Sequence, residues 1–152
     1  SAYDFDAPVL KITPNDYVLE LFHGPSMAFK DFGARFMAAI MSHFLIKSNK
    51  EIKILVATSG DTGGAVAQGF YKVPGISVTI LYPSGKVSDI QEKQLTTLGE
   101  NVTAIEVDGT FDDCQRLVKE AFLDAELTEK YSQIDPAIFL LFRCVCSAEE
   151  NR

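Results

Sequence analysis

The sequence has few basic residues, few cysteines and no long apolar run. Its 14 lysines and arginines stand against 21 aspartates and glutamates, which gives a formal net charge of -7. Such an acidic excess argues against a nucleic acid or an anionic membrane as partner, because phosphate groups select a basic protein surface. No apolar run reaches the length of about 20 residues that a transmembrane helix needs. We therefore expect neither a nucleic-acid partner nor a membrane partner.

The number of cysteines is odd, and they lack the paired spacing of a zinc site. They are Cys114, Cys144 and Cys146. This pattern favours a reducing compartment over a disulfide scaffold. The first residues also lack the basic and then apolar pattern of a secretory signal. We expect a cytoplasmic protein.

Two familiar nucleotide-binding loops are missing as well. A dinucleotide fingerprint needs the pattern G-x-G-x-x-G, followed about twenty residues later by an acid. Here only Gly60 and Gly63 fit, and no acid ends the next apolar run. A Walker A loop needs Ser or Thr directly after Gly-Lys, whereas a valine separates them in SGKVS (84–88). Neither nucleotide site is predicted.

What the sequence does contain is an alternation of short apolar runs with helical patterns. Three runs have the β-rich composition of strands buried in a parallel sheet, namely 53–58, 77–83 and 102–107. Helical patterns surround them at 31–47, 65–72, 88–98 and 111–127. Strands and helices in this alternation form right-handed βαβ units. We predict an α/β fold with a parallel sheet in three layers, preceded by a strand at 17–22.

The character of the chain changes after about Gln133. We assign residues 1–133 to the α/β domain. Residues 134–152 begin with the apolar IDPAIFLLFRCVC and end with the polar SAEENR. We expect this stretch to be a divergent C-terminal tail, and its packing stays open.

A glycine-rich stretch, ATSGDTGGAVA (57–67), follows the first buried strand. Backbone N–H groups at a helix N-terminus can bind an anion, and Ser59 and Thr62 add hydroxyl donors. A tight strand-to-helix turn would need the same glycines for its backbone angles alone, so both interpretations stay open. Asp61 is unusual there, because a carboxylate repels an anion unless it orients a hydroxyl or binds a cation. Its simplest role is to cap the following helix.

A lysine in an apolar setting is the second unusual feature, in LFHGPSMAFKDFG (21–33). Lys30 lies at the expected start of a helix, close in sequence to Met27, Phe29 and Phe32. The positive end of the helix and burial among apolar side chains both disfavour an ammonium ion. A neutral amine is the form that condenses with an aldehyde to a Schiff base. A lysine whose stem merely covers apolar surface is the alternative, and the presence of the glycine loop favours the Schiff base.

The pairing of LELFHGPSMAFKDFG with ATSGDTGGAVA resembles the threonine synthase family of pyridoxal-phosphate enzymes, most closely its bacterial type. The stretches 80–99 and 107–122 resemble that family too, in the same order, so that the likeness covers roughly residues 17–131. It implies the small domain of a fold-type-II enzyme, with Lys30 as the catalytic lysine that binds pyridoxal 5'-phosphate. It also implies a loop that binds the substrate carboxylate, formed by Ser59, Gly60, Asp61, Thr62 and Gly63. Related enzymes such as cysteine synthase usually have asparagine where Asp61 stands, and the aspartate agrees with the threonine synthase branch.

The implied activity is that of a lyase in threonine biosynthesis, which converts O-phospho-L-homoserine and water into L-threonine and phosphate. In the family a larger domain follows and holds the cofactor phosphate and the pyridine nitrogen. We find no matching motifs here and expect the 152-residue chain to be weakly active or inactive alone. Two alternatives stay open: another phospholyase of the same fold type, and a non-catalytic module that binds a polypeptide through an exposed apolar surface. A monomer and a homodimer also both stay open.

Three further residues receive structural roles. His23 follows a strand and could line the pocket, although a lone histidine there is more often structural. Asp31 is expected to stabilise the start of the helix rather than to take part in chemistry. Cys114 falls on the inner side of a helix and is expected in the core.

Overall fold

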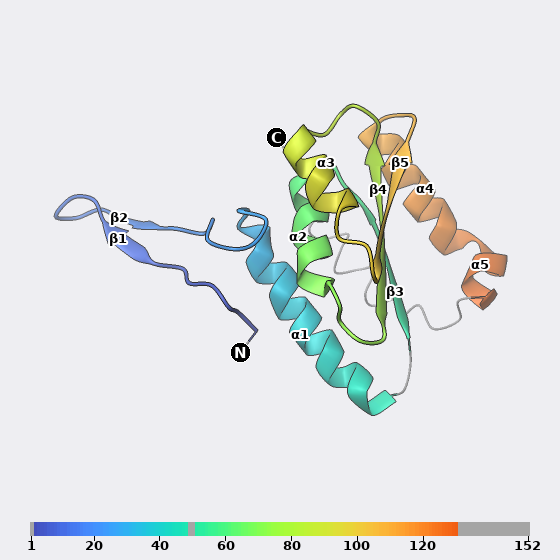
Figure 1. Ribbon diagram of the computed structural model, residues 1–152, viewed down its shortest axis with the longest axis horizontal. Coiled ribbons are helices and arrows are strands. Elements are labelled where there is room, and N and C mark those ends of the chain that lie inside the picture. The colour runs from blue at the N-terminus through green and yellow to red at the C-terminus, as the bar shows by residue number, and fades with distance from the viewer. Residues whose placement is uncertain (1, 49–50, 131–152) are drawn as a thin grey trace.

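The computed structural model describes residues 2–48 and 51–130. Its centre is a parallel sheet in the order β3-β4-β5, formed by β3 (Ile52–Ala57), β4 (Ile76–Pro83) and β5 (Val102–Val107). The helices are α1 (Lys30–Ser48), α2 (Asp61–Phe70), α3 (Asp89–Thr96), α4 (Phe111–Leu123) and α5 (Ala125–Lys130). Helices α1, α2 and α3 lie on one side of the sheet, and α4 and α5 lie on the other (Figure 1). The predicted three-layer α/β fold is confirmed.

The central strand β4 pairs in parallel with both of its neighbours. Ile54 lies opposite Val78, and Val78 lies opposite Val102. Because side chains alternate across a strand, successive residues of β4 face different layers. Ile80 packs in the core under α1, α2 and α3, whereas Leu81 packs against α4. A sheet covered on both faces explains why β3 and β4 are mostly apolar, whereas β5 at the edge is largely exposed and contains Glu106.

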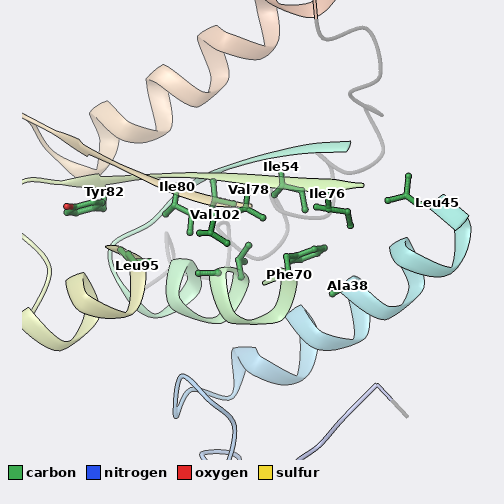
Figure 2. Packing of buried hydrophobic residues seen from close by; sticks show 13 residues of the cluster. Ala38, Leu45, Ile54, Phe70, Ile76, Val78, Ile80, Tyr82, Leu95 and Val102 are labelled. Carbon is green, nitrogen blue, oxygen red and sulfur yellow. The ribbon is translucent and has the colours of Figure 1, made fainter. Parts of the chain in front are cut away.

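The larger hydrophobic core fills the space between the sheet and helices α1, α2 and α3 (Figure 2). Phe70 at the end of α2 is fully buried in it, and burial of such a side chain stabilises a fold by about 1.5–3 kcal/mol. The smaller core on the opposite face consists of Ala57, Leu81, Cys114 and Val118. The position of Cys114 confirms the expectation that it belongs to a core. Burial is the main cause that raises the pKa of its thiol, and Asp113 adds to it.

An antiparallel hairpin precedes α1 and extends away from the α/β domain (Figure 1). It consists of β1 (Val9–Lys11) and β2 (Tyr17–Leu19), and every residue of both strands is exposed. The strand predicted at 17–22 is therefore present but shorter. The segment that precedes the hairpin packs against α1. The centroid of the Phe5 ring lies 5.0 Å from the centroid of the Phe32 ring.

Two helices differ from the sequence prediction. Helix α2 begins at Asp61 rather than near residue 65, so that it includes the glycine pair of the loop. The pattern at 111–127 is divided into α4 and α5 at Asp124, whose backbone is extended. The Asp124 carboxylate accepts hydrogen bonds from two N–H groups in the first turn of α5, which caps that short helix.

The predicted tail at 134–152 lies outside the described residues. Within residues 2–48 and 51–130, no helix is both long enough and apolar enough to cross a membrane.

Candidate active site

The amine of Lys30 and the glycine loop meet at the N-terminal ends of α1 and α2. Lys30 is the first residue of α1, and its Nζ donates a hydrogen bond of 2.7 Å to Thr62 Oγ1 in the first turn of α2. Thr62 is buried and Lys30 is half-buried. The packing of α1 on α2 thus brings together the two motifs that the sequence singled out. Their roles in binding stay predictions.

A cavity of about 160 Å³ opens beside this hydrogen bond, between α1 and α2. It is lined by Phe29, Lys30, Gly33, Ala34, Met37, Thr62, Ala65 and Val66. The Lys30 amine and the Thr62 hydroxyl are the polar side-chain groups of this lining, and the remaining side chains are apolar. The site therefore places the Lys30 amine at the wall of a mostly apolar cavity.

The surroundings of Lys30 are more open than the sequence suggested. Met27 is 66% exposed and Phe29 is 64% exposed, so neither side chain buries the lysine fully. Phe32 faces away and packs with Tyr3 and Phe5, because two residues along a helix correspond to a rotation of about 200°. Phe29 still contacts the site, with its ring centroid 5.9 Å from Lys30 Nζ. The expected burial by all three apolar side chains is therefore only partly correct.

The turn before Lys30 is fixed by a buried carboxylate. Asp31 is 1% exposed and accepts hydrogen bonds from Ser26 N–H at 2.9 Å and Ser26 Oγ at 2.6 Å. Gly24 lies so close that a Cβ there would stand 2.3 Å from Asp31 Oδ2. These contacts hold the start of α1 in place and thereby the Lys30 backbone. The structural role expected for Asp31 is confirmed.

Thr58, which sequence reasoning missed, shapes the glycine loop. Its Oγ1 accepts hydrogen bonds from the N–H groups of Gly60 at 3.0 Å and Gly63 at 2.8 Å. Gly60 has φ of 143°, a conformation that side chains disfavour. Thr58 therefore binds two backbone donors of the loop, and an anion would have to bind other donors there. A threonine directly before the loop was the only signal for this role.

Asp61 does not cap α2, because Gly60 occupies the N-cap position. The Asp61 side chain turns instead to α3, where its Oδ1 accepts a hydrogen bond of 2.8 Å from Gln91 Nε2. Gln91 also completes a capping box with Ser88 at the start of α3. The S-x-x-Q spacing could have predicted this box, but it gives no indication of the contact with Asp61.

His23 lies beside the hairpin rather than in the cavity wall. Its Nε2 stands 2.6 Å from Glu20 Oε2, and its ring stacks on Phe22 at 4.7 Å between centroids. It is absent from the residues that line the cavity described above. The geometry therefore favours a structural role for His23.

A parallel α/β domain with a lysine at a helix start and a glycine loop beside it defines a class of cofactor enzymes. The family model described as "Pyridoxal-phosphate dependent enzyme" matches residues 15–140. The chain belongs to this family, and pyridoxal phosphate is the family's cofactor. The predicted fold agrees with this assignment, and the role of Lys30 stays a prediction.

Within the family, the chain is similar to threonine synthases. It is 55% identical over 129 residues to the threonine synthase of Buchnera aphidicola (subsp. Acyrthosiphon pisum), which is 84% of this chain and 30% of that protein. It is 54% identical over 127 residues to the threonine synthase of Escherichia coli K12, which is 84% of this chain and 29% of that protein. The chain thus spans about 30% of the length of the curated relatives it matches.

Solved structures give the same result. The pyridoxal-phosphate-bound threonine synthase from Brucella melitensis superposes with a TM-score of 0.79 at 42% identity, over 83% of this chain and 27% of that chain. The threonine synthase of E. coli superposes with a TM-score of 0.74 at 53% identity, over 86% and 30% of the two chains. O-ureido-L-serine synthase, at 18% identity and a TM-score of 0.55, shares the fold.

The described residues fit the cofactor of the family. Pyridoxal phosphate requires a primary amine for its aldehyde and a surface for its ring. Lys30 presents the amine at the cavity wall, and Phe29, Met37 and Val66 supply apolar walls beside it. The hydrogen bond to Thr62 gives the amine a defined position. The chemistry of this donor set suits an aromatic aldehyde.

Proposed function

We propose that this chain is the lysine-bearing portion of a threonine synthase, which converts O-phospho-L-homoserine and water into L-threonine and phosphate. The observation that carries the proposal is the 2.7 Å hydrogen bond between Lys30 Nζ and Thr62 Oγ1, which joins the two motifs at one cavity. The 52–55% identity with several bacterial threonine synthases supports this substrate over that of another phospholyase.

Lys30 is the residue that binds the cofactor aldehyde and later moves protons at the α and β carbons of the substrate. When bound, pyridoxal phosphate supplies an electron sink for carbanions. The Thr62 hydroxyl orients the amine, and the Asp31 carboxylate fixes the helix start beneath it. The apolar cavity walls provide a surface against which the cofactor ring could pack.

The loop of Ser59, Gly60, Asp61, Thr62 and Gly63 is proposed to bind the substrate carboxylate. The positive end of α2 favours an anion at this position. Hydroxyl and backbone N–H donors of the loop would then fix the amino-acid end of the substrate next to Lys30. Such positioning is a main source of rate enhancement in enzymes.

The proposal also covers the domain bounds, the kind of partner and the cellular setting. Residues 1–133 would form the α/β domain, and residues 134–152 a divergent tail. The partner is a small molecule rather than a nucleic acid or a membrane, and the setting is cytoplasmic. The acidic charge of -7 supports the exclusion of nucleic acid.

The experiment that tests this function is reductive trapping. Pyridoxal phosphate is added to the 152-residue chain, borohydride reduces the adduct, and peptide mapping locates it. We expect a dominant adduct on Lys30 that the Lys30→Ala variant loses and the Lys93→Ala variant keeps, since Lys93 is an exposed lysine of α3. Labelling spread evenly over surface lysines would overturn the proposal.

A further inference from the structure

One side-chain amide links the N-terminal ends of α2 and α3. Gln91 Oε1 accepts hydrogen bonds from Ser88 N–H at 3.0 Å and from Ser88 Oγ at 3.1 Å. The Nε2 group of the same amide donates to Asp61 Oδ1 at 2.8 Å. Because Oε1 is held by the capping box of α3, the orientation of the amide is fixed, and Nε2 is directed at Asp61.

The backbone of the glycine loop lies against the same amide. A Cβ built on Gly60 would stand 2.3 Å from Gln91 Nε2 and 2.7 Å from Oε1. The loop can therefore approach α3 this closely only because residue 60 is glycine. Gln91 thus contacts the loop twice, through the backbone at Gly60 and through the side chain at Asp61.

The contact gives Asp61 a role that its sequence position left unexplained. A carboxylate in the first turn of a helix is attracted to the N–H groups there, and in this loop it would compete with an incoming anion for them. The hydrogen bond to Gln91 draws the Asp61 carboxylate toward α3 instead. A carboxylate held in this way does not compete with a ligand for the N–H groups at the start of α2.

We propose that Gln91 is a positioning residue, which holds Asp61 against α3 and keeps the loop at residues 59–63 shaped to receive a carboxylate. The inference rests on the proposed carboxylate-binding role of this loop. The inference adds Gln91, a residue of α3 that lies outside the two motifs on which the proposed function rests.

The capping box makes it possible to change the contact between Gln91 and Asp61 without disturbing the start of α3. Glutamate replaces glutamine readily at the third position of a capping box, so Gln91→Glu preserves the start of α3. The same change replaces the donor that faces Asp61 by a second carboxylate. Asp61→Asn supplies a donor in return, so the double variant Q91E/D61N restores the hydrogen bond in the opposite direction.

A matched control separates this effect from simple charge. Gln94 lies one turn further along α3 and faces Gly64, with its Oε1 3.0 Å from the position of a Cβ on that glycine. Gln94→Glu adds the same charge to the same helix without contacting Asp61. A purely electrostatic effect on the loop would be similar for the two glutamates.

The test follows the loop amides of the 152-residue chain by NMR, with acetate as the carboxylate probe. In Gln91→Glu we expect acetate to bind roughly three- to tenfold more weakly, and the Gly60 and Gly63 amides to exchange faster by a similar factor, because one hydrogen bond is lost. We expect values near those of the unaltered chain in Gln94→Glu, and we expect the double variant to recover toward them because its hydrogen bond between residues 61 and 91 is restored.

Any one of the following results would overturn the inference. In the first, Gln91→Glu behaves like the unaltered chain, or the unaltered chain gives no acetate-dependent shifts. In the second, Gln94→Glu is weakened as much as Gln91→Glu. In the third, the double variant stays at the level of Gln91→Glu. None of these measurements uses pyridoxal phosphate, so failure of the Lys30 adduct would contradict the proposed function and leave this test unaffected.

Discussion

Gly69 of α2 packs directly against Ala34 of α1. A Cβ on Gly69 would stand 2.9 Å from Ala34 Cβ and 3.0 Å from the Ala34 carbonyl carbon. The two helices therefore approach as closely as a glycine permits. Lys30 begins α1, and Thr62 lies in the first turn of α2. The close crossing of the two helices therefore helps to set the distance between the Lys30 amine and the Thr62 hydroxyl.

We expect Gly69→Ala to destabilise the domain by about 1–3 kcal/mol, because the added methyl group meets backbone that cannot move aside easily. Urea unfolding of the 152-residue chain measures the change in free energy of unfolding. Gly33→Ala is the matched control, since nothing lies within 4 Å of a Cβ on this residue of α1. Gly33→Ala should be neutral or stabilising by about 0.5–1 kcal/mol. Equal effects of the two changes would contradict the close crossing.

Removal of the Asp31 carboxylate should destabilise the turn ahead of Lys30. Asp31→Ala leaves the buried Ser26 N–H and hydroxyl without their acceptor, which costs about 1–3 kcal/mol. Asp108→Ala, a change at an exposed aspartate, should lie within about 0.5 kcal/mol of the unaltered chain. Thermal unfolding of the three proteins gives the comparison. A small effect of Asp31→Ala would show that the turn is held by other contacts.

The stability of the domain should depend on pH through Asp113. Hydrogen bonds from the Thr110 N–H and hydroxyl, aided by Arg116, hold the pKa of this carboxyl below its ordinary value of 3.8. The unfolded chain therefore takes up the proton first as the pH falls. The stabilising contribution is complete above the ordinary value and is lost as the pH falls through the lower folded value.

Asp113→Asn should remove this part of the pH dependence, since an amide oxygen can still accept from Thr110 but does not titrate. We expect the Tm of the unaltered chain to fall more steeply below about pH 4 than that of the variant. Asp112→Asn, at the exposed neighbouring position, serves as the control. Parallel curves for all three chains would contradict the assignment.

The elements that depend on local patterns of apolar residues could be predicted from the sequence. The apolar runs identified β3, β4 and β5, and the apolar spacing after Lys30 identified α1. The contact between Gln91 and Asp61 could not be predicted, because it joins the side chains of two residues that lie 30 positions apart in the sequence, on different helices. The direction of Phe32 was misjudged for a related reason. Nearness in sequence to Lys30 does not imply contact with it, because the helix turns the Phe32 side chain toward the N-terminal segment.

The 152-residue chain by itself should form little or no threonine. It spans about 30% of the length of its threonine synthase relatives, and a bound cofactor needs contacts to its phosphate and ring beyond a single lysine. Phosphate release from O-phospho-L-homoserine in the presence of pyridoxal phosphate measures the activity. A full-length threonine synthase is the positive control. Robust turnover by this chain would show that the α/β domain alone completes the site.

The hydroxyl of Thr62 should matter for the reaction of Lys30 with pyridoxal phosphate. It accepts a hydrogen bond from Nζ at 2.7 Å and so limits the positions that the long lysine side chain can adopt. Thr62→Val has nearly the same shape without the hydroxyl, and we expect the yield of trapped Lys30 adduct to fall roughly three- to tenfold. Thr62→Ser keeps the hydroxyl and should stay close to the unaltered chain. An undiminished yield in Thr62→Val, with the fold verified by its unfolding curve, would mean that the amine is positioned by the cavity walls and not by Thr62.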